Sequence, residues 1–481
     1  MQSELKNKTI NAVLWSFAEK FGQQLLYLFT GVIVARLVAP AEYGMVGLLG
    51  LFVAIPTILS ESGLPAALIR QKTVSSADYA AVFAFNMAIS VTLYVALFFG
   101  APFIADFYDL PALVPIARVQ FLAILFSACA LVQYVELNRR LAFKLLTKIN
   151  LSAQAVSSLT SVVLALSGVG VWALVVQQVL FAFMRMLGLW FYGSWQLTFS
   201  FQWAILRHFW SFSANMLFVS LLNAFANNVY ALLIGKVYSS AEVGYYTQAN
   251  KYQEISSNII SNSFRAILFP ILSKVNEDRA RALQVLRRML AMVSILIFPC
   301  MFFLAFAARP FIVFLISDIW LPSVQLFAVL CFAGAFLPFT VLLGDTLAVM
   351  GRSDVMLHYD LVRKIFLFLG VVVLFSYGIL YLAYWWIAYM LFSVFLSLWF
   401  IRKVLDYNAF LFLFDIKTHL LSALCWAYLA SLTTPYFSHD ILQLIGQGLL
   451  MATGYLTTLW LLKDATLLEI IHQARQKWIK K

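Results

Sequence analysis

Six polar or charged side chains recur along the apolar segment 244–269, at spacings of 3, 3, 4, 4 and 3 residues. This spacing keeps all six on one face of a helix. The face covers about 17 residues, or roughly 25 Å, which is close to the thickness of the hydrocarbon core of a membrane. Because charge inside a membrane is costly, such a face predicts a surface that meets water or a charged ligand. The six residues are Gln248, Lys251, Glu254, Asn258, Asn262 and Arg265.

Cations outnumber nearby acids inside the apolar segments. Each would cost about 2.5–3.5 kcal/mol if left dry, so five together would cost roughly 12–18 kcal/mol. A surface with excess positive charge suits an anion, and the planar fork of arginine suits phosphate in particular. We therefore predict that these side chains bind an anion such as pyrophosphate. They are Lys20, Lys251, Arg265, Arg118 and Arg185.

Amides and a tyrosine in other segments predict a polar cavity lining that suits a hydroxyl-rich cargo such as a sugar. Interhelical hydrogen bonds would use the same side chains equally well, and Lys251 is spaced to pair with Glu254. Arg265 has no acid within one helical turn. The predicted lining comprises Gln23, Tyr27, Asn223, Asn227, Gln248, Asn258 and Asn262.

Two intramembrane acids are Glu61 and Glu254, and we expect at least one of them to exchange a proton or bind sodium. The alternative for Glu254 is that it only neutralises Lys251. The sequence contains no phosphate-binding loop and none of the common hydrolase or zinc motifs. We expect neither a metal site nor a cofactor, and no enzymatic activity.

The composition excludes a soluble globular protein, because 63% of the 481 residues are hydrophobic and only 11% are charged. The apolar runs are continuous and long enough for helices, which predicts an all-α polytopic membrane protein with about fourteen spans, or twelve. The predicted spans lie near 10–35, 44–69, 79–101, 112–137, 149–167, 170–192, 209–234, 244–269, 289–307, 323–349, 359–376, 378–401, 417–434 and 441–462.

The net charge of +12 is concentrated in alternate loops, such as 139–148 and 274–288. This is the positive-inside pattern, and it predicts that both termini are cytoplasmic and that the chain does not bind nucleic acid. The links on the other side of the membrane are expected to be short, the longest lying near 106–115 and 309–322.

Two pairs of phrases, each about 200 residues apart, resemble each other. Residues 36–44 match 236–244 in a cation followed by Ala-Glu-x-Gly, and 101–104 match 309–312 in Pro-Phe-Ile, each in a predicted link. This repetition predicts two parallel six-helix lobes, as in transporters. The expected parts are an N-lobe at 1–200, a C-lobe at 201–405, and two further helices with an amphipathic cytoplasmic tail at 406–481.

The phrases at 227–236, 244–249 and 269–274 resemble the polysaccharide flippases of the MOP superfamily, as do 35–44 and 137–144. The chain is most similar to the Wzx-like exporters of the colanic- and teichuronic-acid type. The resemblance implies alternating access in the bacterial inner membrane. It also implies, as cargo, an undecaprenyl-pyrophosphate-linked oligosaccharide that moves from the cytoplasmic to the periplasmic leaflet. The implied partners are this substrate, membrane lipid, H⁺ or Na⁺, and the polysaccharide polymerase machinery.

Two rival functions remain open. A multidrug or cation exporter of the same superfamily would need an acidic or aromatic cavity, and the excess of cations argues against it. A membrane polymerase or ligase acting on lipid-linked sugars would need a large external loop, and the sequence offers none.

Overall fold

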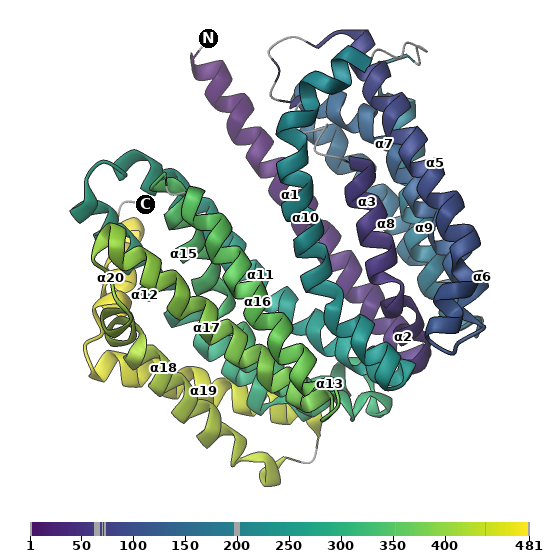
Figure 1. Ribbon diagram of the computed structural model, residues 1–481. Helices are drawn as coiled ribbons and strands as arrows, with labels where there is room; N and C mark the ends of the chain where they lie inside the picture. Colours follow the sequence, from purple (N-terminus) through teal and green to yellow (C-terminus); the bar gives the residue numbers. More distant parts are fainter. Residues whose placement is uncertain are drawn as a thin grey trace. The chain divides into compact units, whose positions relative to one another are not determined.

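The computed structural model shows a chain of α-helices and two 3₁₀ turns, with no strand in the part of the chain that it describes (Figure 1). The chain divides into two compact units, residues 1–244 and 245–481. The described residues are 2–61, 68–69, 71, 74–196, 203–351, 353–437 and 439–479.

In the first unit α1 packs on α8, α8 on α9, α5 on α7, and α10 on α3. The sequence-based parts 1–200, 201–405 and 406–481 stay predictions. The helices are α1 (Gln2–Leu37), α2 (Pro40–Leu48), α3 (Gly50–Glu61), α5 (Ser76–Phe107), α6 (Leu113–Gln120), α7 (Leu122–Arg139), α8 (Phe143–Leu166), α9 (Val171–Tyr192), α10 (Trp203–Val237) and α11 (Ser240–Val275), which continues into the second unit.

The second unit is organised around α12, which packs on α14 and α18, while α17 packs on α14 and α16. Its core contains the buried rings of Phe298, Phe327 and Phe339. The helices are α12 (Arg279–Phe306), α13 (Ala308–Ile316), α14 (Ser323–Gly334), α15 (Leu337–Val349), α16 (Ser353–Leu374), α17 (Ile379–Leu405), α18 (Ala409–Ser431), α19 (Asp440–Leu461) and α20 (Ala465–Ile479), with 3₁₀ turns at Asp318–Trp320 and Thr434–Tyr436.

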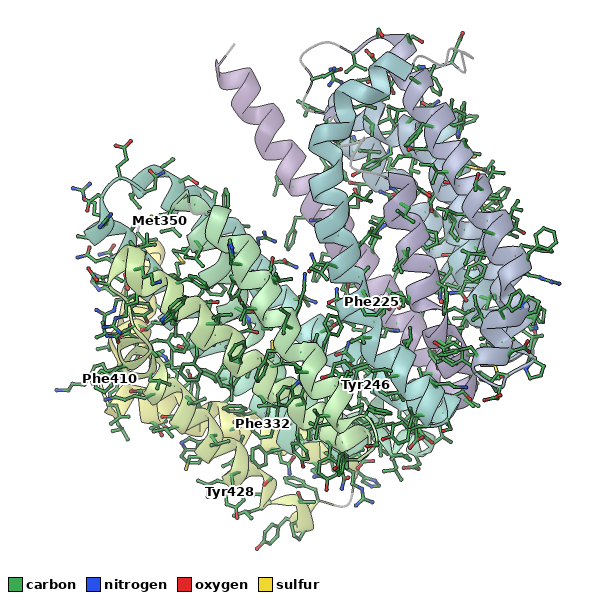
Figure 2. All side chains as sticks on the ribbon, in the orientation of Figure 1. Phe225, Tyr246, Phe332, Met350, Phe410 and Tyr428 are labelled. Atoms are coloured by element: carbon green, nitrogen blue, oxygen red, sulfur yellow. The ribbon has the colours of Figure 1, made fainter. Side chains whose placement is uncertain are left out.

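The predicted membrane class is confirmed. Ten helical segments in the described residues are long and apolar enough to cross a membrane. Large apolar side chains also cover the surface: Phe410 and Tyr428, near the two ends of α18, are 76% and 54% exposed (Figure 2). The remaining predicted spans coincide with α1, α10, α11 and α16, which fall outside the ten. The count of fourteen therefore stays a prediction.

The expected link at 101–104 is wrong, because this phrase belongs to the candidate span α5, whereas 309–312 lies in a short helix, α13, between the spans that end at Phe306 and begin at Ser323. Pro102 lies inside α5, which continues to Phe107, and Pro310 lies in the first turn of α13. A proline in the first turn of a helix costs no hydrogen bond, since the N–H groups there have no partner within the helix.

The first repeated phrase has the same local structure in both copies. Glu42 accepts a hydrogen bond from the backbone N–H of Ala39 at 3.1 Å, and Glu242 accepts one from the N–H of Ser239 at 3.0 Å. Each glutamate thus caps the first turn of a helix, α2 or α11, as in a capping box. The two Ala-Glu-x-Gly sequences therefore share the same helix-capping structure.

The glycines of these two phrases allow the backbones to touch. A Cβ atom on Gly44 would lie 1.6 Å from the carbonyl oxygen of Ser240. A Cβ atom on Gly244 would lie 2.0 Å from the carbonyl oxygen of Pro40. Only glycine permits this approach, since the obstructing atoms belong to the backbone.

Inside α12, Pro299 leaves a carbonyl without its helical partner, because proline has no N–H to bond the oxygen of Ile295 four residues earlier. The hydroxyl of Tyr455 on α19 donates to that oxygen at 3.3 Å. In a membrane a backbone carbonyl must find a partner within the protein. This bond therefore ties α19 to the core of the second unit.

Ion pairs dock the last helices on α12. Arg287 makes a bidentate pair with Asp415 of α18, at 2.8 and 2.6 Å, and Arg288 pairs with Glu469 of α20. Tyr407 also donates to Asp415 at 2.9 Å. Burial raises the pKa of Tyr407, and the negative charge of Asp415 raises it further. The tail predicted to be helical is thus a helix, α20, attached to the second unit.

Asp464 lies at the turn between α19 and α20. Its carboxylate caps α20 by accepting the N–H of Leu467 at 3.0 Å, and it lies 3.3 Å from the buried ring of His419. Burial raises the pKa of Asp464, but hydrogen bonds from His419 and the backbone outweigh it, so the pKa lies below its ordinary value. The ionised carboxylate therefore stabilises this turn.

Candidate anion-binding site

The polar face predicted on α11 exists, and its exposure changes along the helix. Gln248 is 2% exposed and Lys251 is half-buried, whereas the residues that follow on the face are open. A bound group would therefore meet the later part of the face first. The exposed members are Glu254, Asn258, Asn262 and Arg265.

A second polar row fixes the orientation of α11. Gln253 donates to the hydroxyl of Ser257 at 2.7 Å, and Ser257 donates to the carbonyl of Gly334 on α14 at 3.1 Å. A Cβ atom on Gly334 would lie 2.0 Å from Gln253 Nε2, so α11 and α14 pack closely at this contact. Because this row is buried against α14, the predicted face is held away from it.

Arg265 has a counter-ion that its local sequence did not reveal. Its Nε lies 2.7 Å from Oδ2 of Asp345 on α15, and its Nη2 donates to Oδ1 at 3.0 Å. The arginine side chain remains 54% exposed, and the aspartate side chain is 9% exposed. One of the five guanidinium N–H groups donates to Asp345, so other donors remain for another acceptor.

The acid and base suggested as an ion pair on α11 also have other contacts. Glu254 accepts a hydrogen bond from Asn250 at 3.0 Å. The ammonium of Lys251 lies 5.9 Å from the centroid of the Tyr252 ring. Both side chains thus stay on the predicted face, and their roles in binding or ion coupling remain predictions.

In the first unit, two neighbouring charged residues of α1, Glu19 and Lys20, point in different directions. Glu19 accepts hydrogen bonds from Asn150 at 2.7 Å and Thr147 at 3.4 Å, which attaches α1 to α8. Lys20, the next residue, is exposed. Consecutive residues lie about 100° apart on a helix. The charge of Lys20 is therefore turned away from the acid that docks the helix.

Arg118 has a structural partner. Pro102 in α5 leaves the carbonyl of Phe98 without an N–H partner, and Arg118 Nε on α6 donates to this oxygen at 3.2 Å. Its guanidinium also lies 4.4 Å from the centroid of the Phe98 ring, within cation–π range. These contacts account for this cation without any ligand.

The other predicted residues of the first unit lie on three helices. Arg185 of α9 is half-buried, with its guanidinium 5.1 Å from the ring centroid of Tyr134 on α7. The side chain of Glu61 lies outside the described residues. On α1 and α10, Gln23 and Asn223 are half-buried, and Tyr27 and Asn227 are exposed.

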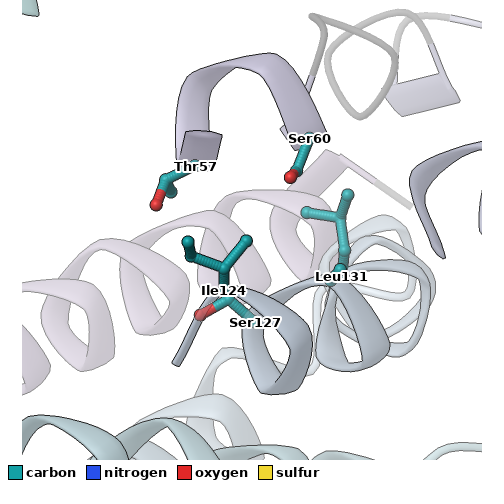
Figure 3. Close-up of a pocket in the computed structure, with 6 residues that line it drawn as sticks. Thr57, Ser60, Ile124, Ser127 and Leu131 are labelled. Atoms are coloured by element: carbon teal, nitrogen blue, oxygen red, sulfur yellow. The ribbon is translucent and has the colours of Figure 1, made fainter. Parts of the chain in front are cut away.

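A small pocket in the first unit lies between α3 and α7 (Figure 3). Hydroxyl groups of Thr57, Ser60 and Ser127 line it together with apolar side chains. Its size suits a single water molecule, and it is too small for a sugar. No group of metal-binding side chains occurs among the residues that the structure describes.

Sequence reasoning overlooked three charged residues on α16. Arg363 donates to Asp360 at 2.8 Å, and Lys364 is only 2% exposed. They lie near the start of a predicted span, where they would pass for a cytoplasmic flank. The spacing Asp360–Arg363, one turn apart, was the available signal of an ion pair.

The fold resembles those of two solved membrane transporters. It resembles the solved structure "Lipid II flippase MurJ, inward closed conformation", with a TM-score of 0.75 and 14% identity over 93% of this chain and 98% of that one. It also resembles a multidrug resistance MATE family transporter of the MOP superfamily, with a TM-score of 0.59 and 15% identity over 86% and 96%. At these identities the likeness concerns the fold alone.

Residues 33–325 match the family described as "Polysaccharide biosynthesis protein", and the chain belongs to this family. Among its relatives is the succinoglycan biosynthesis transport protein ExoT of Rhizobium meliloti, 25% identical over 76% of this chain and 74% of that protein. Another is the lipopolysaccharide biosynthesis protein WzxC of Escherichia coli, 21% identical over 77% and 75%. The resemblance to Wzx-like proteins is thus confirmed, and the protein is a multi-pass membrane protein of this family.

Proposed function

We propose that the protein flips an undecaprenyl-pyrophosphate-linked oligosaccharide from the cytoplasmic to the periplasmic leaflet of the bacterial inner membrane. The pyrophosphate would rest against the cationic face of α11 while the lipid tail stays in the bilayer. Two lobes would alternate in opening, without covalent chemistry. The family and the transport function in the name of ExoT support this proposal.

The single observation that carries the proposal is the state of Arg265. Its pair with Asp345 holds the guanidinium while more than half of the side chain stays exposed, with further N–H donors left over. A held guanidinium with spare donors suits phosphate oxygens. The amides of Asn262 and Asn258, exposed one and two turns away, suit sugar hydroxyls.

A multidrug exporter is the second candidate, because the MATE fold is shared. A cationic drug would meet repulsion from Lys251 and Arg265 on α11, whereas a pyrophosphate would meet attraction. Glu254 is the only acid on this polar face in the described part of α11. Asp345 of α15 balances the charge of Arg265, so an anionic cargo is favoured by the guanidinium donors that this pair leaves open.

The test is complementation of a flippase-deficient strain at matched membrane expression. Arg265→Ala alone would leave Asp345 unpaired, which mixes folding with binding. The double variant Arg265→Asp with Asp345→Arg keeps the pair and moves the cation to α15. We expect the double variant to fold but fail to restore polymer output, and Arg265→Lys to be intermediate, because it keeps the charge but loses the fork.

Each charge-assisted contact contributes about 1.5–3 kcal/mol, so loss of one should weaken binding roughly 10- to 150-fold. Full polymer output from the exchanged pair would mean that Arg265 is structural and that the phosphates are held elsewhere. Lys417→Ala, on α18 and outside the predicted site, is the matched control and should complement normally.

The proposed orientation has its own test. Asp109, in the short link after α5, is exposed and predicted to be periplasmic, while Lys144 at the start of α8 is predicted to be cytoplasmic. A cysteine at Asp109 should react with an impermeant thiol reagent in whole cells, and one at Lys144 should not. The opposite labelling pattern would reverse the topology.

A further inference from the structure

The start of α16 holds an unusual group of charges. Lys364 is 2% exposed and Tyr359 is 3% exposed, so both are enclosed by the second unit. Asp360 and Arg363 form an ion pair at 2.8 Å, with side chains 25% and 21% exposed. The helix packs against α15 and α17, and Tyr389 of α17 is also buried.

Arg363 forms an ion pair with Asp360, the one acid in this group. Its guanidinium bonds Asp360 and lies 5.1 and 5.9 Å from the ring centroids of Tyr359 and Tyr389. Asp345, the acid on α15, pairs with Arg265. No acceptor within hydrogen-bond distance of Lys364 Nζ exists among the residues that the structure describes. One acid and two bases leave a single positive charge without a counter-ion.

An ammonium group has three donors and needs acceptors for them, whereas a neutral amine has a much smaller cost of burial. In a membrane protein, ionisable residues without partners mark ion or proton pathways. Lys364 is fully enclosed, so no ligand reaches it in this state. The geometry thus favours a neutral amine here and an ammonium wherever α16 meets water.

We propose that Lys364 is the proton-exchanging group of the transport cycle. In the state of this structure it would be a neutral amine. In a state that opens α16 to water on one side of the membrane, the amine would take a proton from a hydronium ion there, and on return to the enclosed state it would pass the proton to water that is continuous with the other side. In each transfer one N–H bond forms or breaks, and an O–H bond of water or hydronium breaks or forms in exchange. This inference rests on the proposed function for its coupling role, and it places coupling on a base instead of Glu61 or Glu254.

The first experiment measures the thermal stability of the purified full-length protein between about pH 6 and pH 9. Variants are Lys364→Met, which keeps the length of the side chain without charge, and Lys364→Arg, which cannot release its proton. Lys403→Met, at an exposed lysine near the end of α17, is the matched control.

If Lys364 is buried as an amine, folding must remove the proton that this lysine carries in the unfolded chain. Removal of that proton costs less free energy as pH rises, so the wild type and the control gain stability with pH. Lys364→Met should be at least as stable at pH 7 and should lack this gain. Lys364→Arg should be less stable throughout. A Lys364→Met variant that is clearly less stable than wild type would overturn the proposal, because it would reveal a partnered ammonium.

The second experiment places the protein in liposomes with an undecaprenyl-pyrophosphate-linked trisaccharide and a pH-sensitive dye. Substrate-dependent proton movement should occur in the wild type and control and fall to background in Lys364→Met, which should still equilibrate the lipid. Proton movement in Lys364→Met, or none in a wild type that flips the lipid, would overturn the proposal. Failure of the wild type to move the lipid would refute the proposed function instead, and the stability result would then decide the state of Lys364.

Discussion

Replacing Gly44 by alanine should strongly destabilise the first unit. The added Cβ would lie 1.6 Å from the carbonyl oxygen of Ser240, whereas a carbon and a carbonyl oxygen normally approach no closer than about 3.3 Å. One backbone must therefore move by roughly 1.7 Å, and no flexible side chain can absorb the shift. Overpacking a core with flexible neighbours costs about 1–3 kcal/mol, so we expect about 3 kcal/mol or more.

Each kcal/mol lowers the Tm of a domain of about this size by roughly 2–4 °C, so Gly44→Ala should lose about 6–12 °C. The assay is the thermal unfolding of the purified protein, followed by loss of the monodisperse peak. Gly100→Ala on α5 is the matched control, because nothing lies within 4 Å of its added Cβ. The control should be neutral or slightly stabilised, since alanine favours helix over glycine by about 1 kcal/mol.

Equal Tm values for Gly44→Ala and Gly100→Ala would refute the close approach of the two repeated phrases. Gly244→Ala provides an independent repeat of the experiment, because its Cβ would lie 2.0 Å from the carbonyl oxygen of Pro40. Both substitutions should destabilise if the contact is a backbone contact.

Arg118→Leu should destabilise the protein by about 1.5–3 kcal/mol through loss of the hydrogen bond to the Phe98 carbonyl. Adding Pro102→Ala should recover most of this stability, because alanine restores a backbone N–H. No recovery in the double variant would show that the carbonyl is not the reason for the arginine. The docking of α20 should weaken in acid. Because the pKa of Asp464 is depressed, the stability it contributes is present above the ordinary value of 3.8 and is lost as pH falls below it. The rate of amide hydrogen exchange in α20 measures this docking. Asp464→Asn keeps a capping oxygen but loses the charge facing His419, so its α20 should exchange at neutral pH as fast as that of the wild type in acid. Unchanged exchange in that variant would contradict the assignment.

The helices could be predicted from sequence because each apolar run had to be long enough to cross a membrane with its backbone bonds satisfied. The polar face of α11 could be predicted for a related reason, since helical periodicity alone places residues 248–265 on one side. The link at 101–104 was predicted wrongly because hydropathy alone did not show that α5 continues through Pro102 to Phe107. A proline in a first turn is harmless, and inside α5 its cost is offset by Arg118.

Partners of charged residues could not be predicted, because they depend on packing between distant segments. Asp345 lies 80 residues from Arg265, and no periodicity connects them. The lack of a hydrogen-bond acceptor for Lys364 could not be predicted either, because it depends on how α15 and α17 pack around this side chain. Local sequence shows which side chains share a helix face, and only the fold shows which of them are neutralised.

The measurement that tests the central claim most directly is lipid flipping by the purified protein in liposomes. An undecaprenyl-pyrophosphate-linked oligosaccharide labelled on its sugar should become accessible to an impermeant enzyme on the opposite leaflet. Added undecaprenyl pyrophosphate should compete, and the exchanged pair Arg265→Asp with Asp345→Arg should reduce flipping to the level of empty liposomes. Flipping that the exchange leaves intact, or export of a cationic dye without any flipping of the lipid, would contradict the account.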